Sequence, residues 1–178
     1  MRSFFPRFHA RPRVLGTVLC LQLAGFGSPL AAETSPYAGE EERPLKAMGP
    51  RQVEALREGR GMGLACAAEL NRYPGPMHVL ELAEELALTE PQYEETEALR
   101  RQVKREARRL GRLLLRAERR MEAAFQAGTV EPAEVDAWTA WTGQLRGRLR
   151  AVHLKAHVRQ RALLSEDQIA LYDELRGY

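Results

Sequence analysis

Two long, nearly unbroken helical patterns constrain the fold of this chain more than any other feature of its sequence. From Thr89 to Ala127, apolar residues recur at a period close to 3.6. From Pro132 to Leu163 they recur in a heptad-like 3-4 spacing. The segment between the two patterns breaks the first helix at Gly128, and Pro132 suits the start of the next. We therefore expect two long antiparallel helices that form a hairpin.

The apolar positions of both patterns form the predicted core. In the first pattern they are Leu99, Val103, Leu110, Leu114, Ala117, Met121 and Phe125. In the second they are Val135, Trp138, Thr142, Leu145, Leu149, Val152 and Ala156. Two long helices with short flanking helices leave one broad face poorly covered, and such a face typically serves dimerisation or binding.

Shorter helical segments flank the two long ones. A first stretch is expected from about Pro50 to Leu70, and its glycine cluster at 59–63 indicates close packing or a break. The turn at 73–76, with two prolines and a glycine, leads to a short helix from His78 to about Ala87. A tail helix follows residue 165. Because no segment shows strand-like alternation, the predicted fold class is all-α.

Two pentapeptides mark helix starts. They are Leu88-Thr89-Glu90-Pro91-Gln92 and Leu164-Ser165-Glu166-Asp167-Gln168. Each has a hydroxyl residue at the N-cap and a Gln at the third helical position. In this capping box the hydroxyl and the Gln amide each satisfy a backbone N–H that the helix leaves unpaired. The boxes are expected to open the first long helix and the tail helix.

The N-terminus has the pattern of a cleavable export signal. Residues 1–13 hold four arginines and no acidic residue, and an apolar run from Val14 to Phe26 precedes small residues that end at Ala32. The run is too short for a confident membrane span, which needs about 20 apolar residues. We expect residues 1–32 to be removed on export, residues 33–50 to form a flexible tether, and residues 51–178 to form one helical domain.

Removal of the signal changes the charge argument. The whole chain has a net charge of +3, whereas residues 33–178 hold 23 basic and 24 acidic residues and a net charge of −1. The basic excess thus belongs to the signal, which argues against nucleic-acid binding. Cys66 is the one cysteine after residue 32, so no intramolecular disulfide is expected. Its neighbours suit a small buried residue; an intermolecular disulfide or a soft metal ligand are the alternatives.

Histidines supply the candidate metal site. His153 and His157 stand at i and i+4, on one helix face, and this spacing suits two imidazoles that share a Zn, Ni, Co or Cu ion. His78 lies on the short helix before the first box, with Glu81 on its face. The predicted metal ligands are therefore His78, His153, His157 and Glu81, with Met77 or Glu97 as alternatives to Glu81. A solvated face of an arginine-rich helix explains the same histidine pair without a metal.

Arginines supply a candidate binding surface. Between residues 100 and 120 the chain holds ten basic and two acidic residues, whereas the stretch from Glu81 to Glu97 holds seven acidic residues and no basic one. The periodic arginines lie roughly opposite the apolar stripe. Such segregation attracts acidic partners over long range. The residues expected to bind unfolded clients are Arg101, Arg105, Arg108, Arg112, Arg116 and Arg119.

Catalytic patterns are weak in this sequence. It contains no HExxH motif, no phosphate loop and no spacing typical of a Ser-His-Asp triad. We therefore predict a protein that is not an enzyme. A membrane-surface role for the arginine stripe is a subordinate alternative, because the opposite face of that helix is committed to the core.

With its two boxes, export signal and all-α pattern, the chain resembles the Spy/CpxP family of LTxxQ-motif periplasmic proteins, which is related to CnrX- and ZraP-type heavy-metal resistance proteins. The resemblance covers roughly residues 60–178, and the second box has Ser165 in place of Thr. It implies a hairpin that dimerises into a curved cradle, acts in the periplasm and has no catalytic activity. Its implied partners are a second copy and either unfolded periplasmic proteins or the periplasmic domain of a sensor kinase.

The resemblance also bears on the histidines. CnrX-type members bind metal through His residues of the first helix and an HxxxH or HxxxM pair on the last long helix, a layout that His78, His153 and His157 match. Leu82 departs from it, because those proteins have a second His there. Our leading prediction is an ATP-independent chaperone or envelope-stress accessory, with metal modulation as an option. The alternative is a periplasmic heavy-metal sensor.

Overall fold

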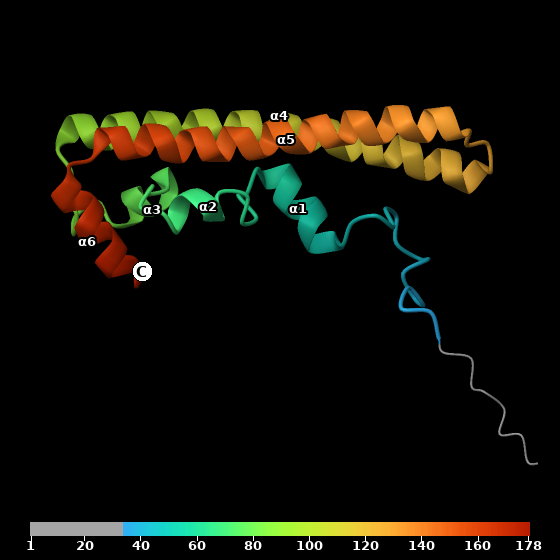
Figure 1. Ribbon diagram of the computed structural model, residues 1–178, viewed down its shortest axis with the longest axis horizontal. Helices are drawn as coiled ribbons and strands as arrows, with labels where there is room; N and C mark the ends of the chain where they lie inside the picture. The colour runs from blue at the N-terminus through green and yellow to red at the C-terminus, as the bar shows by residue number, and fades with distance from the viewer. Residues whose placement is uncertain (1–33) are drawn as a thin grey trace, which may run out of the picture. The chain divides into compact units, whose positions relative to one another are not determined.

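The computed structural model describes residues 34–178, and within them Tyr37–Tyr178 form one compact unit (Figure 1). The predicted signal peptide lies outside the described residues. Between residues 34 and 178 the chain forms helices and no strand, which confirms the all-α prediction. The helices are α1 (Pro50–Glu58), α2 (Cys66–Glu69), α3 (Pro76–Glu81), α4 (Glu90–Ala127), α5 (Pro132–Leu163) and α6 (Glu166–Arg176).

The two long helices, α4 and α5, lie side by side (Figure 1). Near one end the Gln160 amide donates to the Thr96 hydroxyl at 3.0 Å, and farther along Arg146 donates to Glu118 at 2.7 Å. Since residue numbers fall along α5 as they rise along α4, the helices run in opposite directions. No helix in the described part of the chain has both the length and the hydropathy needed to cross a membrane.

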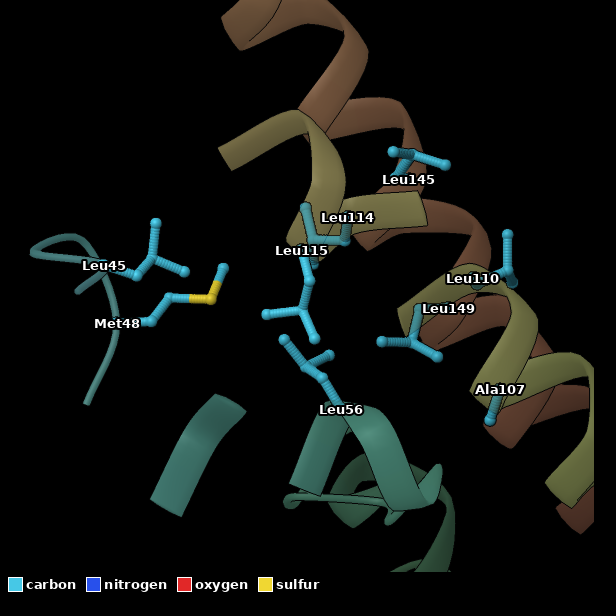
Figure 2. Packing of buried hydrophobic residues seen from close by; sticks show 9 residues of the cluster. All are labelled: Leu45, Met48, Leu56, Ala107, Leu110, Leu114, Leu115, Leu145 and Leu149. Carbon is cyan, nitrogen blue, oxygen red and sulfur yellow. The ribbon is translucent and has the colours of Figure 1, made fainter. Parts of the chain in front are cut away.

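The main core fills the space between α4, α5 and α1 (Figure 2). Leu110 and Leu114 of α4 meet Leu145 and Leu149 of α5, and none of the four is more than 3% exposed. These four predicted positions are thus buried, whereas the predicted Val103, Ala117 and Val152 are only partly buried. Phe125, near the end of α4, is 57% exposed, because α1 does not reach that far.

Helix α1 crosses α4 in direct backbone contact. A Cβ atom added to Gly111 would lie 2.2 Å from the Leu56 carbonyl oxygen, so only glycine allows this approach. Helix α1 then ends at Gly59, whose φ of +70° is the left-handed C-cap conformation. Of the two interpretations of the glycine cluster, a break is observed: it divides the expected stretch from 50 to 70 into α1 and the short α2.

The predicted flexible tether needs a correction at its C-terminal end. Leu45 and Met48 are only 4% and 3% exposed and belong to the main core cluster. Lys46, between them, donates from Nζ to Glu122 of α4 at 2.8 Å. The apolar side chains of this segment gain more from burial than the segment loses in chain entropy.

Helix α3 is shorter than predicted, because the chain leaves the helical conformation after Glu81 and Ala87 adopts a φ of +46°. The segment that follows still contributes to a second core cluster, in which Val79, Leu86 and Tyr172 are fully buried. Leu88 and Leu164, the leading residues of the two boxes, pack against this cluster. The boxes thus anchor the end of the unit where α3, α4, α5 and α6 meet.

Candidate functional site

The six predicted client-binding arginines form a row on the outer face of α4. All six side chains are exposed, and the buried residues of the helix lie on its opposite face. Their backbone positions are fixed by one unbroken helix whose apolar side packs against α5 and α1. We call these residues the arginine row: Arg101, Arg105, Arg108, Arg112, Arg116 and Arg119.

Most of the arginine row is not neutralised within the molecule. Arg101 pairs with Glu97, one turn away, and Arg108 donates from Nε to the Glu58 carbonyl oxygen at 3.2 Å. The other four make no ion pair or side-chain hydrogen bond with residues 34–178; they are Arg105, Arg112, Arg116 and Arg119. Helix α5 adds six basic residues and no acidic one between 137 and 165. The middle of the α4–α5 pair is therefore strongly positive.

The two boxes make the capping bonds expected of them. The Gln92 backbone N–H donates to the Thr89 hydroxyl at 3.4 Å, and the Thr89 N–H donates to Gln92 Oε1 at 3.0 Å. At the second box the corresponding distances between Ser165 and Gln168 are 3.1 and 2.9 Å. Both boxes are thus confirmed as helix starts.

The boxes also bind each other, which local reasoning did not predict. Gln92 Nε2 donates to Gln168 Oε1 at 2.9 Å, and Gln168 Nε2 donates to Gln92 Oε1 at 3.1 Å. Each amide donates once more, Gln92 to the Leu163 carbonyl oxygen at 2.8 Å and Gln168 to that of Leu86 at 3.1 Å. This glutamine clasp joins the last residue of α5 to the segment before α4. It closes the end of the α4–α5 pair opposite to the Gly128 turn.

The four predicted metal ligands fall into separate pairs. His78 and Glu81 contact each other across one turn of α3, with 2.8 Å between Nδ1 and Oε2. On α5, His157 Nδ1 lies 2.7 Å from the Tyr73 carbonyl oxygen. His153 is only 8% exposed, and its Nε2 has no hydrogen-bond partner among the described residues. Burial, and next the charge of His157, lower the pKa of His153.

The described arrangement does not bring the four predicted metal ligands together at one point. Within residues 34–178, no three His, Cys, Asp or Glu side chains converge on a point where they could hold one. The His157 nitrogen that faces Tyr73 is already engaged. The histidine pair on α5 thus presents two nitrogens at most.

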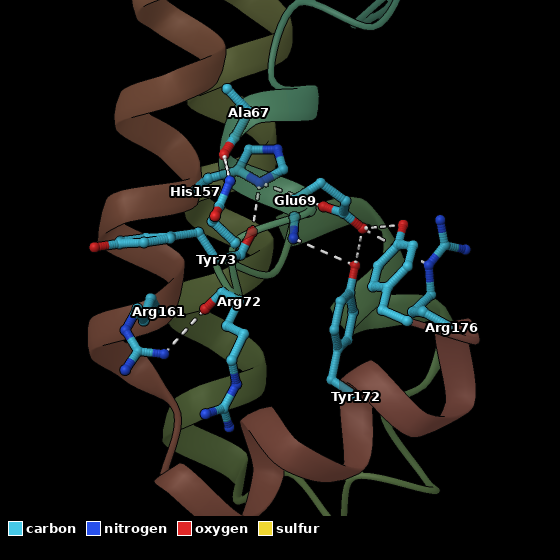
Figure 3. Close-up of polar contacts among 11 residues, drawn as sticks. Ala67, Glu69, Arg72, Tyr73, His157, Arg161, Tyr172 and Arg176 are labelled. Carbon is cyan, nitrogen blue, oxygen red and sulfur yellow. Dashed lines mark hydrogen bonds and ion pairs between the residues drawn. The ribbon is translucent and has the colours of Figure 1, made fainter.

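A polar cluster that the sequence did not reveal surrounds Glu69 of α2 (Figure 3). The Tyr172 hydroxyl of α6 donates to Glu69 Oε1 at 2.5 Å and accepts from the Gly75 N–H at 3.4 Å. His157 approaches the other carboxylate oxygen of Glu69 at 3.4 Å. Burial, followed by the hydrogen bond to Glu69, raises the pKa of Tyr172 well above its ordinary range. The cluster ties α2 and α6 to α5.

Two more positions differ from expectation or add to it. Cys66 is exposed, so the expected role as a small buried residue is wrong; it stands at the first position of the short α2, outside the core. An open and mostly apolar concavity of about 570 Å³ lies at the Gly128 turn. The residues that line it are Phe125, Gly128, Val130, Pro132, Val135 and Asp136.

Comparisons with known proteins give no relative for this chain: no family model, no curated protein and no solved structure matches it.

Proposed function

We propose that this protein is a periplasmic, non-enzymatic chaperone or envelope-stress accessory of the Spy/CpxP type, built as a helical hairpin. It captures acidic segments of unfolded proteins, or of a sensor domain, on the arginine row of α4. The export signal and the two boxes of the sequence support the compartment and the family. The arginine row supports the mode of binding and is the observation on which the proposal depends.

The arginine row suits an acidic and extended partner. Four of its guanidinium groups have no partner in residues 34–178, so binding need not break an existing ion pair. Arginine presents a planar fork of donors that matches a carboxylate, and it carries its charge at any physiological pH. The excess of positive charge along the α4–α5 pair speeds the encounter with acidic chains and makes it dependent on salt.

Exposed apolar side chains could hold a captured client. Phe125 and Trp141 are 57% and 43% exposed, and the apolar concavity at the Gly128 turn lies beside Phe125. Unfolded chains expose both charged and apolar segments. Capture by charge followed by apolar contact therefore needs no ATP and no catalytic group.

The test compares two clients of similar size and opposite charge, reduced α-lactalbumin (acidic) and reduced lysozyme (basic). Aggregation is followed by light scattering at about 50 mM and about 0.5 M salt, at which the Debye length falls from over 10 Å to about 4 Å. We expect strong suppression of α-lactalbumin aggregation at low salt, weak suppression at high salt and little effect on lysozyme. Absence of suppression for both clients at either salt would remove the chaperone proposal.

A matched pair of variants assigns the effect to α4. The first neutralises Arg105, Arg112 and Arg116 by substitution with Gln. The control neutralises Arg148, Arg150 and Lys155 of α5 in the same way, so both variants lose three positive charges. We expect the α4 variant to lose most of the suppression and the α5 variant to keep most of it. Equal losses would mean that net charge, and not the arginine row, captures the client.

The alternative, a heavy-metal sensor, has one supporting observation: the buried His153 Nε2 lacks a hydrogen-bond partner and lies one turn from His157. A third ligand would have to come from outside the described arrangement. Calorimetric titration with Zn, Ni and Cu tests this alternative, with His153→Ala/His157→Ala as the control. Equal heats for both proteins would end it.

A further inference from the structure

The α4–α5 pair has two broad sides, and α1, α2 and α3 lie along one of them (Figure 1). On this covered side, His157 and Arg161 of α5 reach carbonyl oxygens in the segment before α3, at 2.7 and 3.0 Å. Arg159 stands two residues from each of them, and two residues are about 200° of rotation on a helix. Arg159 therefore lies on the other broad side, which we call the back face.

Each long helix contributes one row of residues to the back face. Arg159 donates to Gln102 of α4 at 3.5 Å, which places Gln102 on this face as well. Arg109 and Leu113 stand two residues before and after Gly111, the residue that meets α1 on the covered side. The α4 row has separations of 3, 4, 4, 3 and 4 residues, and the α5 row has separations of 7, 7 and 4 residues, so each row keeps to one side of its helix. The α4 row is Gln102, Arg105, Arg109, Leu113, Arg116 and Arg120, and the α5 row is Trp141, Arg148, Lys155 and Arg159.

The back face is strongly positive. All seven arginines and lysines of its two rows are exposed. One acidic residue lies among them, Glu106, and it pairs with Arg109 at 2.6 Å. The next acidic residues in line with the two rows are Glu95 and Glu134, each of which stands seven residues beyond the end of its row. The positive charge is thus confined to the middle of the helix pair, where each row extends over 18 residues, or about 27 Å.

Two parallel rows of charge favour a flat anionic surface over a single acidic chain. The axes of packed helices lie about 8–10 Å apart. An extended peptide follows one row at a time, whereas a planar array of phosphate groups meets both rows at once. Residues 33–178 have a net charge of −1, so the attraction is local and turns the back face toward the anionic surface.

Trp141 adds a side chain that suits the boundary of a membrane. It stands at one end of the α5 row and is 43% exposed. Tryptophan is enriched at membrane–water interfaces, because its ring is apolar and its N–H is polar. We propose that the back face binds the surface of an anionic phospholipid bilayer, with its basic residues on the phosphate groups and Trp141 among the headgroups.

This surface goes beyond the proposed client site and does not rest on the function proposed above. It shares Arg105 and Arg116 with the arginine row, and Trp141 with the apolar residues proposed to hold clients. The three basic residues of the α5 row belong to the back face alone. Substitutions of these three residues therefore test membrane binding while the arginine row stays intact.

Co-sedimentation with lipid vesicles tests the proposal, on the chain without residues 1–32, which keeps the whole compact unit. The vesicles contain phosphatidylcholine alone or with about 30% phosphatidylglycerol, at about 50 mM or about 0.5 M salt. We expect binding to the phosphatidylglycerol vesicles at low salt, weaker by at least about tenfold at high salt, and little binding to phosphatidylcholine alone. Tryptophan emission should shift to shorter wavelength on binding, and Trp141→Phe should remove most of this shift.

A matched pair of variants assigns the binding to the back face. Each basic residue near an anionic surface favours binding about fivefold, so loss of three should lower the vesicle partition coefficient by at least about tenfold. The back-face variant is Arg148→Gln/Lys155→Gln/Arg159→Gln. The control removes the same charge from exposed residues that stand two positions from a member of either row, and hence on the covered side; it should change the coefficient by less than about threefold. This control is Arg100→Gln/Lys104→Gln/Arg150→Gln.

Glu106→Gln tests the proposal in the opposite direction. It removes the acidic residue of the back face and frees Arg109 from its ion pair. Binding to the phosphatidylglycerol vesicles should therefore become tighter by about threefold or more. A misfolded variant would not give such a gain, and an unchanged or weaker affinity would count against the proposal.

Several results would overturn the proposal. They are no binding to phosphatidylglycerol vesicles at low salt, binding that salt does not weaken, and equal losses for the two triple variants. Binding of soluble polyaspartate with the vesicles left unbound would also overturn it, because the back face would then receive an acidic chain.

The outcome is separable from that of the proposed function. The back-face variant keeps its whole arginine row, so it should suppress client aggregation about as well as the wild type. If this variant loses vesicle binding but no form of the protein protects a client, the membrane surface stands and the chaperone proposal falls. If clients are protected and no vesicle is bound, the reverse holds.

Discussion

A single substitution, Gln92→Glu, separates the contribution of the glutamine clasp to stability from the contribution of helix capping. Glu is at least as good as Gln at the third position of a helix, because it can make the same capping bond and its negative charge interacts favourably with the helix dipole. The substitution therefore keeps the capping bond to the Thr89 N–H. It removes the two bonds that Gln92 Nε2 donates, to the Leu163 carbonyl at 2.8 Å and to Gln168 at 2.9 Å.

The expected loss follows from those two bonds. Each hydrogen bond contributes about 0.5–1.5 kcal/mol net, so the loss is about 1–3 kcal/mol. The carboxylate that replaces the amide also places a negative charge against the Leu163 carbonyl oxygen and Gln168 Oε1. This repulsion moves the expected loss of stability toward the upper end of the range. For a domain near 150 residues this corresponds to about 2–4 °C in Tm per kcal/mol. Urea denaturation followed by circular dichroism gives the free energy directly.

Glu134→Gln supplies the matched control. Glu134 Oε2 accepts from the Glu131 N–H at the start of α5 at 3.2 Å, and it is exposed and far from the clasp. The reverse substitution there should change the free energy of unfolding by less than about 0.5 kcal/mol, as surface substitutions usually do. Similar values for Gln92→Glu and the control would refute the claim that the clasp stabilises this end of the unit.

Three further substitutions test other parts of the structure. Gly111→Ala should cost about 1–3 kcal/mol in urea denaturation, because its Cβ would collide with the Leu56 carbonyl oxygen; an unchanged midpoint would contradict the crossing of α1 over α4. Tyr172→Phe should cost about 1.5–3 kcal/mol, since the buried hydroxyl donates to the Glu69 carboxylate, and a calorimetric Tm equal to the wild type would argue against this contact. The pKa of His153 lies below its unfolded value of about 6.5, so the unfolded chain binds more protons and stability falls as the pH decreases below about 6.5. His153→Leu should flatten that part of a stability–pH curve, and a slope identical to the wild type would show that another group titrates.

The long helices were predictable because their signals are local and repeated. Apolar periodicity places α4 and α5, and both observed helices end at the predicted residues, Ala127 and Leu163. Thr89 and Gly128 bound α4 by capping preferences that depend on neighbouring residues alone. The arginine row follows from the same periodicity, since residues opposite a buried stripe must face solvent.

The remaining contacts join residues that no local pattern relates. Gln92 and Gln168 are 76 residues apart, and their capping roles explain both residues without any contact between them. Glu69 and Tyr172 are 103 residues apart and stand in no recognisable motif. The burial of Leu45 was not predicted, because the prolines and acidic residues around it are typical of a flexible segment and a single apolar side chain does not change that pattern.

The central claim is that the arginine row of α4 receives acidic clients, and side-chain NMR tests it most directly. Each arginine Nε–H gives its own signal, so a titration with reduced α-lactalbumin at low salt locates the binding surface. The largest shifts should belong to Arg105, Arg112 and Arg116, and they should vanish at about 0.5 M salt. Shifts confined to the indole signals of Trp138 and Trp141 of α5, with the arginine signals unmoved, would contradict it.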